Sequence, residues 1–258
     1  MITDRRFLST KSVSTKQLAI VYAVFLHVAL AVILWKSDFL SSIKYRLGLV
    51  IPTVQSELTD YYYQTLNYHR RSVEIVPDDA VIFIGDSLTQ GLNVSAVYPL
   101  SVNYGIGGDT TVGVLERLSV YMPALERAKY IVLAIGINDT YHRGPEKAIR
   151  NYAQILDNLP QDRPIIVSAV LPVDAAANEE KLAKRVDWRK TFNTELKRLA
   201  DEREFVTFVD SSAELDPNGD ERLEPSLHDG GGVHLNADGN RIWAKHLRNT
   251  ILRLETVQ

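Results

Sequence analysis

The stretch "IFIGDSLTQG", residues 82–91, determines how the rest of the chain is interpreted. It opens with apolar β-forming residues, reaches Gly85 and places Ser87 two residues later. The residues before Gly85 are typical of a buried strand, and those after it are typical of a turn that leads into a helix. Ser87 therefore fits two roles, the N-cap of a helix or a nucleophile presented at the edge of a sheet.

Short apolar runs alternate with amphipathic segments from Val81 onward. Pro145–Leu159, for example, repeats apolar residues at helical spacing behind an N-terminal proline. Strands that are apolar throughout and separated by helices indicate a parallel sheet covered on both faces. We predict strands near residues 81–84, 101–104, 130–135, 164–170 and 205–209.

Composition limits the classes of function. The 258 residues, 45% hydrophobic and 24% charged, suffice for one large core, and the absence of cysteine excludes a thiolate nucleophile, a disulfide framework and a metal site built on sulfur. Residues 1–36 carry five basic residues and one acidic residue, which leaves 24 basic and 31 acidic residues, a net charge of −7, for the remainder. An acidic body without basic runs excludes a nucleic-acid partner.

An 18-residue run without formal charge, Leu18–Trp35, lies near the N-terminus. As a helix at ~1.5 Å per residue it would be ~27 Å long, close to the ~30 Å thickness of the bilayer hydrocarbon. We predict a short basic segment at 1–17 and a single-pass transmembrane signal anchor at 18–35. The slight excess of Lys and Arg before it predicts a cytoplasmic N-terminus and a body on the periplasmic side of the inner membrane. A cleaved signal peptide and a buried helix of a soluble protein are the alternatives.

Residues 36–77 are predicted to form a helical connector, and residues 78–258 the main domain of the chain. A helix-like part of the connector contains four tyrosines. We interpret them as packing on the domain, with the bilayer interface as the alternative location. The four tyrosines are Tyr61, Tyr62, Tyr63 and Tyr68.

Polar and glycine residues gather at the predicted carboxyl ends of the strands, which is where parallel sheets bind ligands. The first strand is followed by Ser87, the second by Gly107 and Gly108, and the third by Asn138. Glycines allow a backbone N–H to approach an oxyanion, and an asparagine amide is a further donor. A turn or helix cap remains the alternative for Asn138 and for its neighbour Asp139.

The candidate base is His234, which lies in the glycine-rich stretch "HDGGGVHLNADG" before an amphipathic helix. A loop at the head of the final helix can fold back over the end of the first strand. Together, Ser87 and His234 predict a nucleophile and its general base. We interpret His69, His142 and His246 as surface residues.

Four blocks, "GDSLTQG", "NYGIGGDTT", "GIND" and "GVHLN", occur in this order and resemble those of the SGNH or GDSL hydrolase family. The runs "GIGGDTTVGVLERL" and "VLPV" are similar to the branch that contains platelet-activating-factor acetylhydrolase-like and carbohydrate O-acetylesterase-like members. The resemblance covers about residues 78–250. It implies a flavodoxin-like three-layer α/β/α fold and a metal-independent carboxylic ester hydrolase. Ser87 would be the nucleophile, His234 the general base, and Gly108, Asn138 and the Ser87 backbone N–H the oxyanion donors.

The triad acid departs from the family pattern. Members usually place an aspartate three residues before the histidine, where this chain has Gly231. We predict Asp229, five residues before, as the acid, with two glycines inserted as a bulge. Asp220, Glu224 or a Ser–His dyad without an acid are the alternatives.

Two further motifs lack residues that cofactor or metal binding requires. "GIGGDT" lacks the third glycine of a dinucleotide fingerprint, and "DPNGD" is not followed by the glycine and glutamate of a calcium loop. We therefore expect neither cofactor nor metal. The expected function is hydrolysis of acetyl or other short acyl esters on small-molecule, glycan or lipid substrates. A lysophospholipase or thioesterase, and a non-catalytic binding domain on a membrane tether, are the alternatives.

Overall fold

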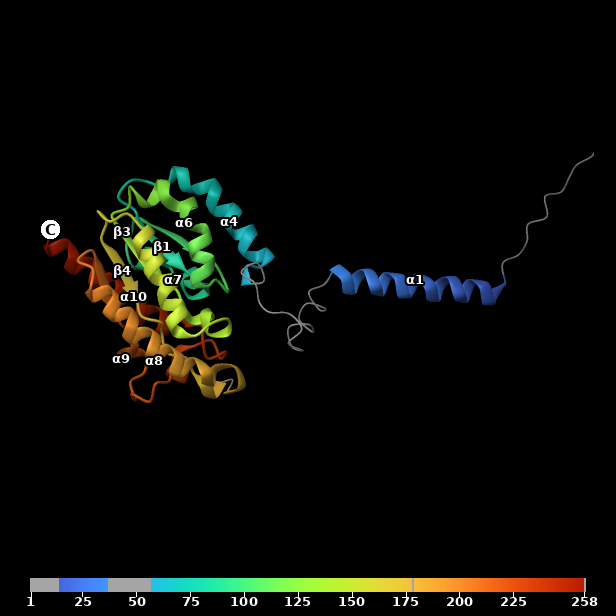
Figure 1. Ribbon diagram of the computed structural model, residues 1–258. Coiled ribbons are helices and arrows are strands. Elements are labelled where there is room, and N and C mark those ends of the chain that lie inside the picture. The colour runs from blue at the N-terminus through green and yellow to red at the C-terminus, as the bar shows by residue number, and fades with distance from the viewer. Residues whose placement is uncertain (1–13, 37–56, 178, 258) are drawn as a thin grey trace, which may run out of the picture. The chain divides into compact units, whose positions relative to one another are not determined.

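The computed structural model describes residues 14–36, 57–177 and 179–257, and the chain divides into two units, residues 1–52 and 53–258 (Figure 1). In the first unit, α1 (Thr15–Lys36) is one apolar helix of 22 residues. The predicted span at 18–35 lies within α1. This helix is long and apolar enough to cross a membrane, and a signal sequence near an N-terminus has the same properties.

The second unit is built on a five-stranded sheet in which every strand pair is parallel. The strand order β2-β1-β3-β4-β5 is that of flavodoxin-like folds. All five predicted strands are confirmed, and with them the predicted fold class. The strands are β1 (Val81–Gly85), β2 (Ser101–Gly105), β3 (Tyr130–Ala134), β4 (Ile165–Ser168) and β5 (Val206–Val209).

Helices cover both faces of this sheet (Figure 1). Four of them, α4, α6, α7 and α8, share a hydrophobic cluster with one face, and α10 packs on the other. The helices are α4 (Asp60–Ser72), α5 (Ser87–Gly91), α6 (Thr111–Leu125), α7 (Pro145–Asn158), α8 (Glu179–Asp201), α9 (Ser212–Leu215) and α10 (Ala237–Val257). Short 3₁₀ turns are η1 (Val73–Ile75), η2 (Val94–Ala96), η3 (Ile137–Tyr141), η4 (Ala175–Ala177) and η5 (Pro225–Leu227).

The central strand β1 shows why a strand covered on both faces is apolar throughout. Ile82 and Ile84 belong to the cluster under α6 and α7, whereas Val81 and Phe83 belong to the cluster under α10. Successive side chains of a strand point to opposite faces, so both sets must be apolar when both faces are covered. In α10 the buried Trp243 donates its indole N–H to Ser168 Oγ at 3.1 Å.

The register of the strands brings together the turns that carry the candidate site residues. Gly85 at the end of β1 pairs with Gly105 of β2 and Ala134 of β3. The three following turns therefore leave the same edge of the sheet side by side. Gly85 is required at this position, because a Cβ there would lie 2.3 Å from the carbonyl oxygen of Ala134.

Part of the connector packs against the sheet unit through α4. Tyr62 and Leu66 are buried in the cluster under α6. Packing thus holds for Tyr62, whereas Tyr61, Tyr63 and Tyr68 remain 43–63% exposed.

Candidate active site

The turn after β1 leaves the hydroxyl of Ser87 free for chemistry. Asp86 is the N-cap of α5, and its carboxylate accepts a hydrogen bond from the Leu88 N–H at 2.9 Å. The capping role considered for Ser87 therefore belongs to Asp86. Ser87 is the first residue of α5 and is partly exposed.

His234 lies against this serine, although the two residues are 147 positions apart. The distance between His234 Nε2 and Ser87 Oγ is 3.0 Å, which is hydrogen-bonding distance. Asn236 fixes where the loop ends, because its Oδ1 accepts from the N–H groups of Asp238 and Gly239 at the start of α10. The loop thus folds back over the end of β1, the arrangement required for a nucleophile and its base.

Asp229 is the acid that approaches His234 among the residues the structure describes. Its Oδ2 lies 3.8 Å from His234 Nδ1, and its backbone N–H donates to the His234 carbonyl at 3.0 Å. Both side chains are about half exposed. The other two candidate acids face elsewhere: Asp220 accepts from the Arg222 N–H, and Glu224 accepts from the side chain of Asn218.

The inserted glycines do not form a free bulge, because they wrap around a second histidine, His228. Its Nδ1 accepts from the N–H groups of Gly230 at 2.9 Å and Gly232 at 3.3 Å. Its Nε2 therefore carries the proton and donates to Asp174 Oδ2 at 3.0 Å. Both side chains of this pair are at most 5% exposed, and Arg222 holds the same carboxylate. A Cβ on Gly232 would lie 2.5 Å from the Asp174 carbonyl oxygen, so the loop closes tightly.

The predicted oxyanion donors lie on the neighbouring turn. The Asp109 N–H donates to the Ile106 carbonyl at 3.1 Å, and Gly108 has φ +77°, as the third residue of a type II turn requires. No described residue accepts a hydrogen bond from the Gly108 N–H. Asn138, from η3, donates through Nδ2 to the Asp109 carbonyl at 3.0 Å, so its amide sits beside the same turn.

Asp139 anchors η3 to Thr111, the first residue of α6. Its side chain is fully buried and accepts hydrogen bonds from the N–H and hydroxyl of Thr111 at 2.9 and 2.6 Å. Arg143 forms an ion pair with the same carboxylate. The last residue of the "GIND" block thus has a structural role that supports the placement of Asn138.

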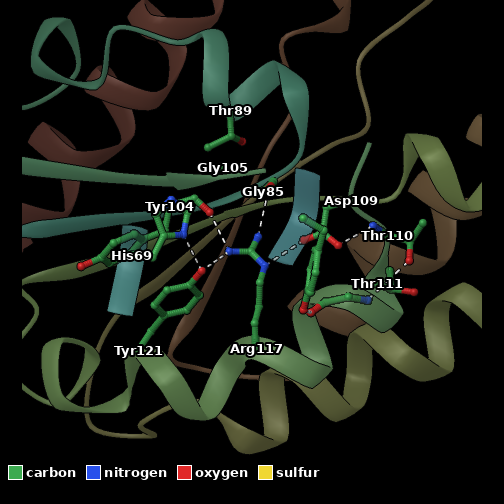
Figure 2. A network of polar contacts seen from close by, with 12 residues as sticks. His69, Gly85, Thr89, Tyr104, Gly105, Asp109, Thr110, Thr111, Arg117 and Tyr121 are labelled. Carbon is green, nitrogen blue, oxygen red and sulfur yellow. Dashed lines mark hydrogen bonds and ion pairs between the residues drawn. The ribbon is translucent and has the colours of Figure 1, made fainter. Parts of the chain in front are cut away.

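A buried arginine, Arg117 of α6, joins the two turns (Figure 2). Its guanidinium donates to the Gly85 carbonyl at 3.0 Å and the Tyr104 carbonyl at 2.7 Å, at the ends of β1 and β2. Its Nε donates to Asp109 Oδ2 at 2.8 Å, with both side chains fully buried. One cation therefore fixes the turn that carries Ser87 and the turn that carries Gly108. Arg117 lies within the run "GIGGDTTVGVLERL", but no role for it was predicted from the sequence.

The same network reaches the connector through His69. The Tyr121 hydroxyl accepts from Arg117 and therefore donates to His69 Nδ1 at 2.8 Å (Figure 2). Burial, with the nearby Arg117 charge, lowers the pKa of His69 to about 4, so the ring stays neutral. The interpretation of His69 as a surface residue is wrong, because its ring also packs 4.8 Å from that of Tyr104.

The carboxyl group of Asp86, the N-cap of α5, has a raised pKa. Burial raises the pKa of Asp86 to about 7, from an ordinary 3.8; the Leu88 N–H opposes this shift and the carboxylates of Asp109 and Asp139 add to it. Because the folded-state pKa is the higher one, the folded chain keeps a proton that the unfolded chain releases. This group therefore favours folding at low pH, and its contribution is lost as the pH rises from about 4 to about 7.

The Asp86→Asn variant is expected to lack this pH dependence. An asparagine still accepts from the Leu88 N–H but carries no charge at any pH. The melting temperature of the variant, relative to the unaltered chain, should rise by a few °C between pH 5 and pH 8 in thermal denaturation. A difference that stays constant over this range would show that Asp86 does not titrate there.

Comparison with known proteins identifies a family match. A family model of GDSL-like lipases and acylhydrolases matches residues 83–242. Platelet-activating factor acetylhydrolase IB subunit alpha1 of Rattus norvegicus is 32% identical over 117 residues, which cover 42% of this chain. The match covers 50% of the relative, so the chain spans about half the length of the curated relative it matches.

Solved structures share the fold. A GDSL-like lipase from Bacteroides thetaiotaomicron superposes with a TM-score of 0.63 at 17% identity, over 73% of this chain and 98% of the other. A variant of an acetyl xylan esterase from Geobacillus stearothermophilus gives a TM-score of 0.54 at 22% identity, over 67% and 94%. The family match covers more than half of the residues and includes the turns that carry Ser87, Gly108, Asn138 and His234. The chain belongs to the GDSL-like lipase and acylhydrolase family.

Proposed function

We propose that the chain is a membrane-anchored serine ester hydrolase that removes acetyl or other short acyl groups from carbohydrate or lipid-linked substrates. The observation that carries this proposal is the 3.0 Å contact between Ser87 Oγ and His234 Nε2. A non-catalytic binding domain would not require a serine and a histidine that are 147 positions apart in the sequence to lie at hydrogen-bonding distance. Relatives and structural neighbours named as an acetylhydrolase and an acetyl xylan esterase support the acyl chemistry.

The proposed reaction proceeds through an acyl-enzyme. Ser87 Oγ attacks the ester carbonyl carbon while His234 Nε2 takes the hydroxyl proton. The oxyanion that forms is held by the N–H groups of Ser87 and Gly108 and by the Asn138 amide. The carbonyl re-forms, and the alcohol leaves with the proton from His234. Water then attacks the acyl-enzyme with His234 again as base, which releases the acid and restores Ser87.

Exposure of the site favours short acyl groups. The side chains of His234 and Asp229 are 54% and 51% exposed, so the reacting atoms lie near the protein surface. A long acyl chain bound at an open site stays largely in water and gains little from burial. This supports acetyl transfer to water over the lysophospholipase or thioesterase alternative.

The membrane anchor is proposed from α1 and from charge. The helix rises ~33 Å at ~1.5 Å per residue, which matches the hydrocarbon thickness. The basic residues that precede it support a cytoplasmic N-terminus and a catalytic domain on the extracytoplasmic side of the inner membrane.

The detergent-solubilised full-length chain is expected to hydrolyse p-nitrophenyl acetate far faster than its Ser87→Ala variant. Across p-nitrophenyl esters, kcat/KM should be highest for acetate and fall by about tenfold or more toward decanoate, because the open site does not bury the longer chain. Equal rates for the two proteins would support the binding-domain alternative. A steady rise in kcat/KM from acetate to decanoate would support the lysophospholipase alternative.

A further inference from the structure

The connector helix α4 reaches the oxyanion turn through a chain of two hydrogen bonds. The Tyr61 hydroxyl accepts from Gln90 Nε2 at 2.6 Å. The Oε1 atom of the same Gln90 accepts from the Gly107 N–H at 3.0 Å. Gly107 directly precedes Gly108, whose N–H is a proposed oxyanion donor. Tyr61 therefore holds one side of the turn that carries this donor.

The ring of Tyr61 also lies beside the nucleophile. A Cβ built on Gly107 would lie 3.3 Å from Tyr61 Cε1 and 4.0 Å from Ser87 Cβ. The aromatic ring and the serine therefore flank the same small residue. Because Tyr61 is 49% exposed, part of its ring remains open to a molecule bound at Ser87.

Two neighbours of Tyr61 fix the connector at this place. Tyr62 is 3% exposed and donates its hydroxyl proton to the Gly113 carbonyl at 2.8 Å. Glu57 accepts from Thr110 Oγ1 at 3.2 Å and forms an ion pair with Arg143 in which neither side chain is more than 7% exposed. These contacts hold the connector on residues 110–113, directly after the oxyanion turn. The position of Tyr61 is therefore determined by buried contacts and not by a chance surface approach.

We propose that Tyr61 is a positioning and specificity residue of the esterase site. Its hydroxyl, through Gln90, orients the turn that carries Gly108, and its ring forms a wall against which the substrate packs. The wall suits an apolar or ring-shaped group attached to the ester. Tyr61 lies outside residues 83–242, the part matched by the family model, so this contribution comes from the connector. The inference rests on the proposed esterase function.

Two substitutions separate the roles of the hydroxyl and the ring. In Tyr61→Phe the ring remains but Gln90 loses its acceptor, so kcat for p-nitrophenyl acetate should fall about 2- to 10-fold with KM nearly unchanged. In Tyr61→Leu the ring is lost as well, and KM should in addition rise several-fold. Tyr68→Phe and Tyr68→Leu are the matched controls, because Tyr68 is on the same helix and is 63% exposed. Both controls should retain the kinetics of the unaltered chain.

Gln90 tests whether the effect passes through the proposed chain. Gln90→Met removes both hydrogen bonds and should lower kcat at least as much as Tyr61→Phe. Gln90→Glu should retain most activity, because its carboxylate accepts from both the Gly107 N–H and the Tyr61 hydroxyl. The double variant Tyr61→Phe/Gln90→Met should be no slower than Gln90→Met alone, since both changes break one chain.

The outcomes separate this inference from the proposed function. Hydrolysis by the unaltered chain no faster than by Ser87→Ala would overturn the function and the inference together. Clear hydrolysis by the unaltered chain, with Tyr61→Phe indistinguishable from Tyr68→Phe, would overturn the inference alone. Strictly additive losses in the double variant would do the same. Melting temperatures of all variants, measured alongside, identify any loss of activity that comes from unfolding.

Discussion

Replacing Arg117 with methionine is expected to lower the free energy of unfolding by about 3–5 kcal/mol. The fully buried guanidinium is the cation that faces Asp109, and its removal leaves that carboxylate buried without a countercharge, although the Thr110 N–H still donates to it at 2.8 Å. The carbonyl oxygens of Gly85 and Tyr104 lose the guanidinium at the same time, although Gly85 still accepts from the Ile106 N–H at 3.0 Å. Esterase activity should fall with stability, because the turns that carry Ser87 and Gly108 lose their common support. Urea denaturation followed by near-UV circular dichroism measures the stability.

A surface arginine and a change of pH provide the controls. Arg198→Met removes an arginine that is 56% exposed and pairs with Glu195 and Glu202, and it should change stability by less than about 1 kcal/mol. Burial already raises the pKa of Asp109 to about 6, against the opposing charge of Arg117. Without Arg117 this pKa should rise further, so the loss of stability in Arg117→Met should be smaller at pH 5, where Asp109 is neutral, than at pH 8. An identical loss at both pH values would contradict the proposed ion-pair effect.

Asp229→Asn is expected to lower kcat/KM for p-nitrophenyl acetate by about 10²-fold, or about 3 kcal/mol of transition-state stabilisation. In the proposed mechanism this carboxylate would orient His234 and stabilise the imidazolium that forms when Ser87 attacks. In triad enzymes the loss of this acid costs up to ~10⁴-fold, but here the pair is half exposed and 3.8 Å apart, so water screens part of the interaction. The fold should be unaffected because Asp229 is on the surface.

Asp238→Asn is the matched control for Asp229→Asn. Asp238 is 67% exposed, lies at the start of α10 and pairs with Arg241, so its replacement should leave kcat/KM unchanged. If Asp229→Asn is nearly silent while Asp220→Asn or Glu224→Gln strongly lowers activity, the acid comes from elsewhere. Silence at all three positions would indicate a Ser–His dyad.

The parts of the fold and site that could be predicted from the sequence depend on local pattern. Each strand is a short, largely apolar run, and all but β4 are followed by a glycine or polar turn. The strand positions and the residues at most of their carboxyl ends therefore follow from the pattern of apolar runs alone. The proximity of Ser87 and His234 was predicted from the loop before the final helix, which can fold back over the end of β1, and from the family resemblance.

The supporting residues could not be predicted because their partners are distant in the sequence. Arg117 sits in a helix where an arginine usually faces solvent, and its burial depends on how α6 packs over β1 and β2. His69 resembles a surface histidine until Tyr121, 52 residues away, is brought against it. Asp174 and His228 are 54 residues apart, and neither belongs to a block that the family resemblance identifies.

The ring of His228 has a consequence for how proteins of this kind are recognised from sequence. The chain between the acid and the base turns around an imidazole whose two nitrogens are both used, one by the Gly230 and Gly232 N–H groups and one by Asp174. Such a turn holds Asp229 near His234 although five positions separate them. If Asp229 is the triad acid as proposed, the number of residues between acid and base depends on the path of the loop and is not fixed by the chemistry. A search pattern with a fixed three-residue gap would miss such chains, whereas one that allows a longer gap, and looks for a preceding histidine with a distant aspartate, would retain them.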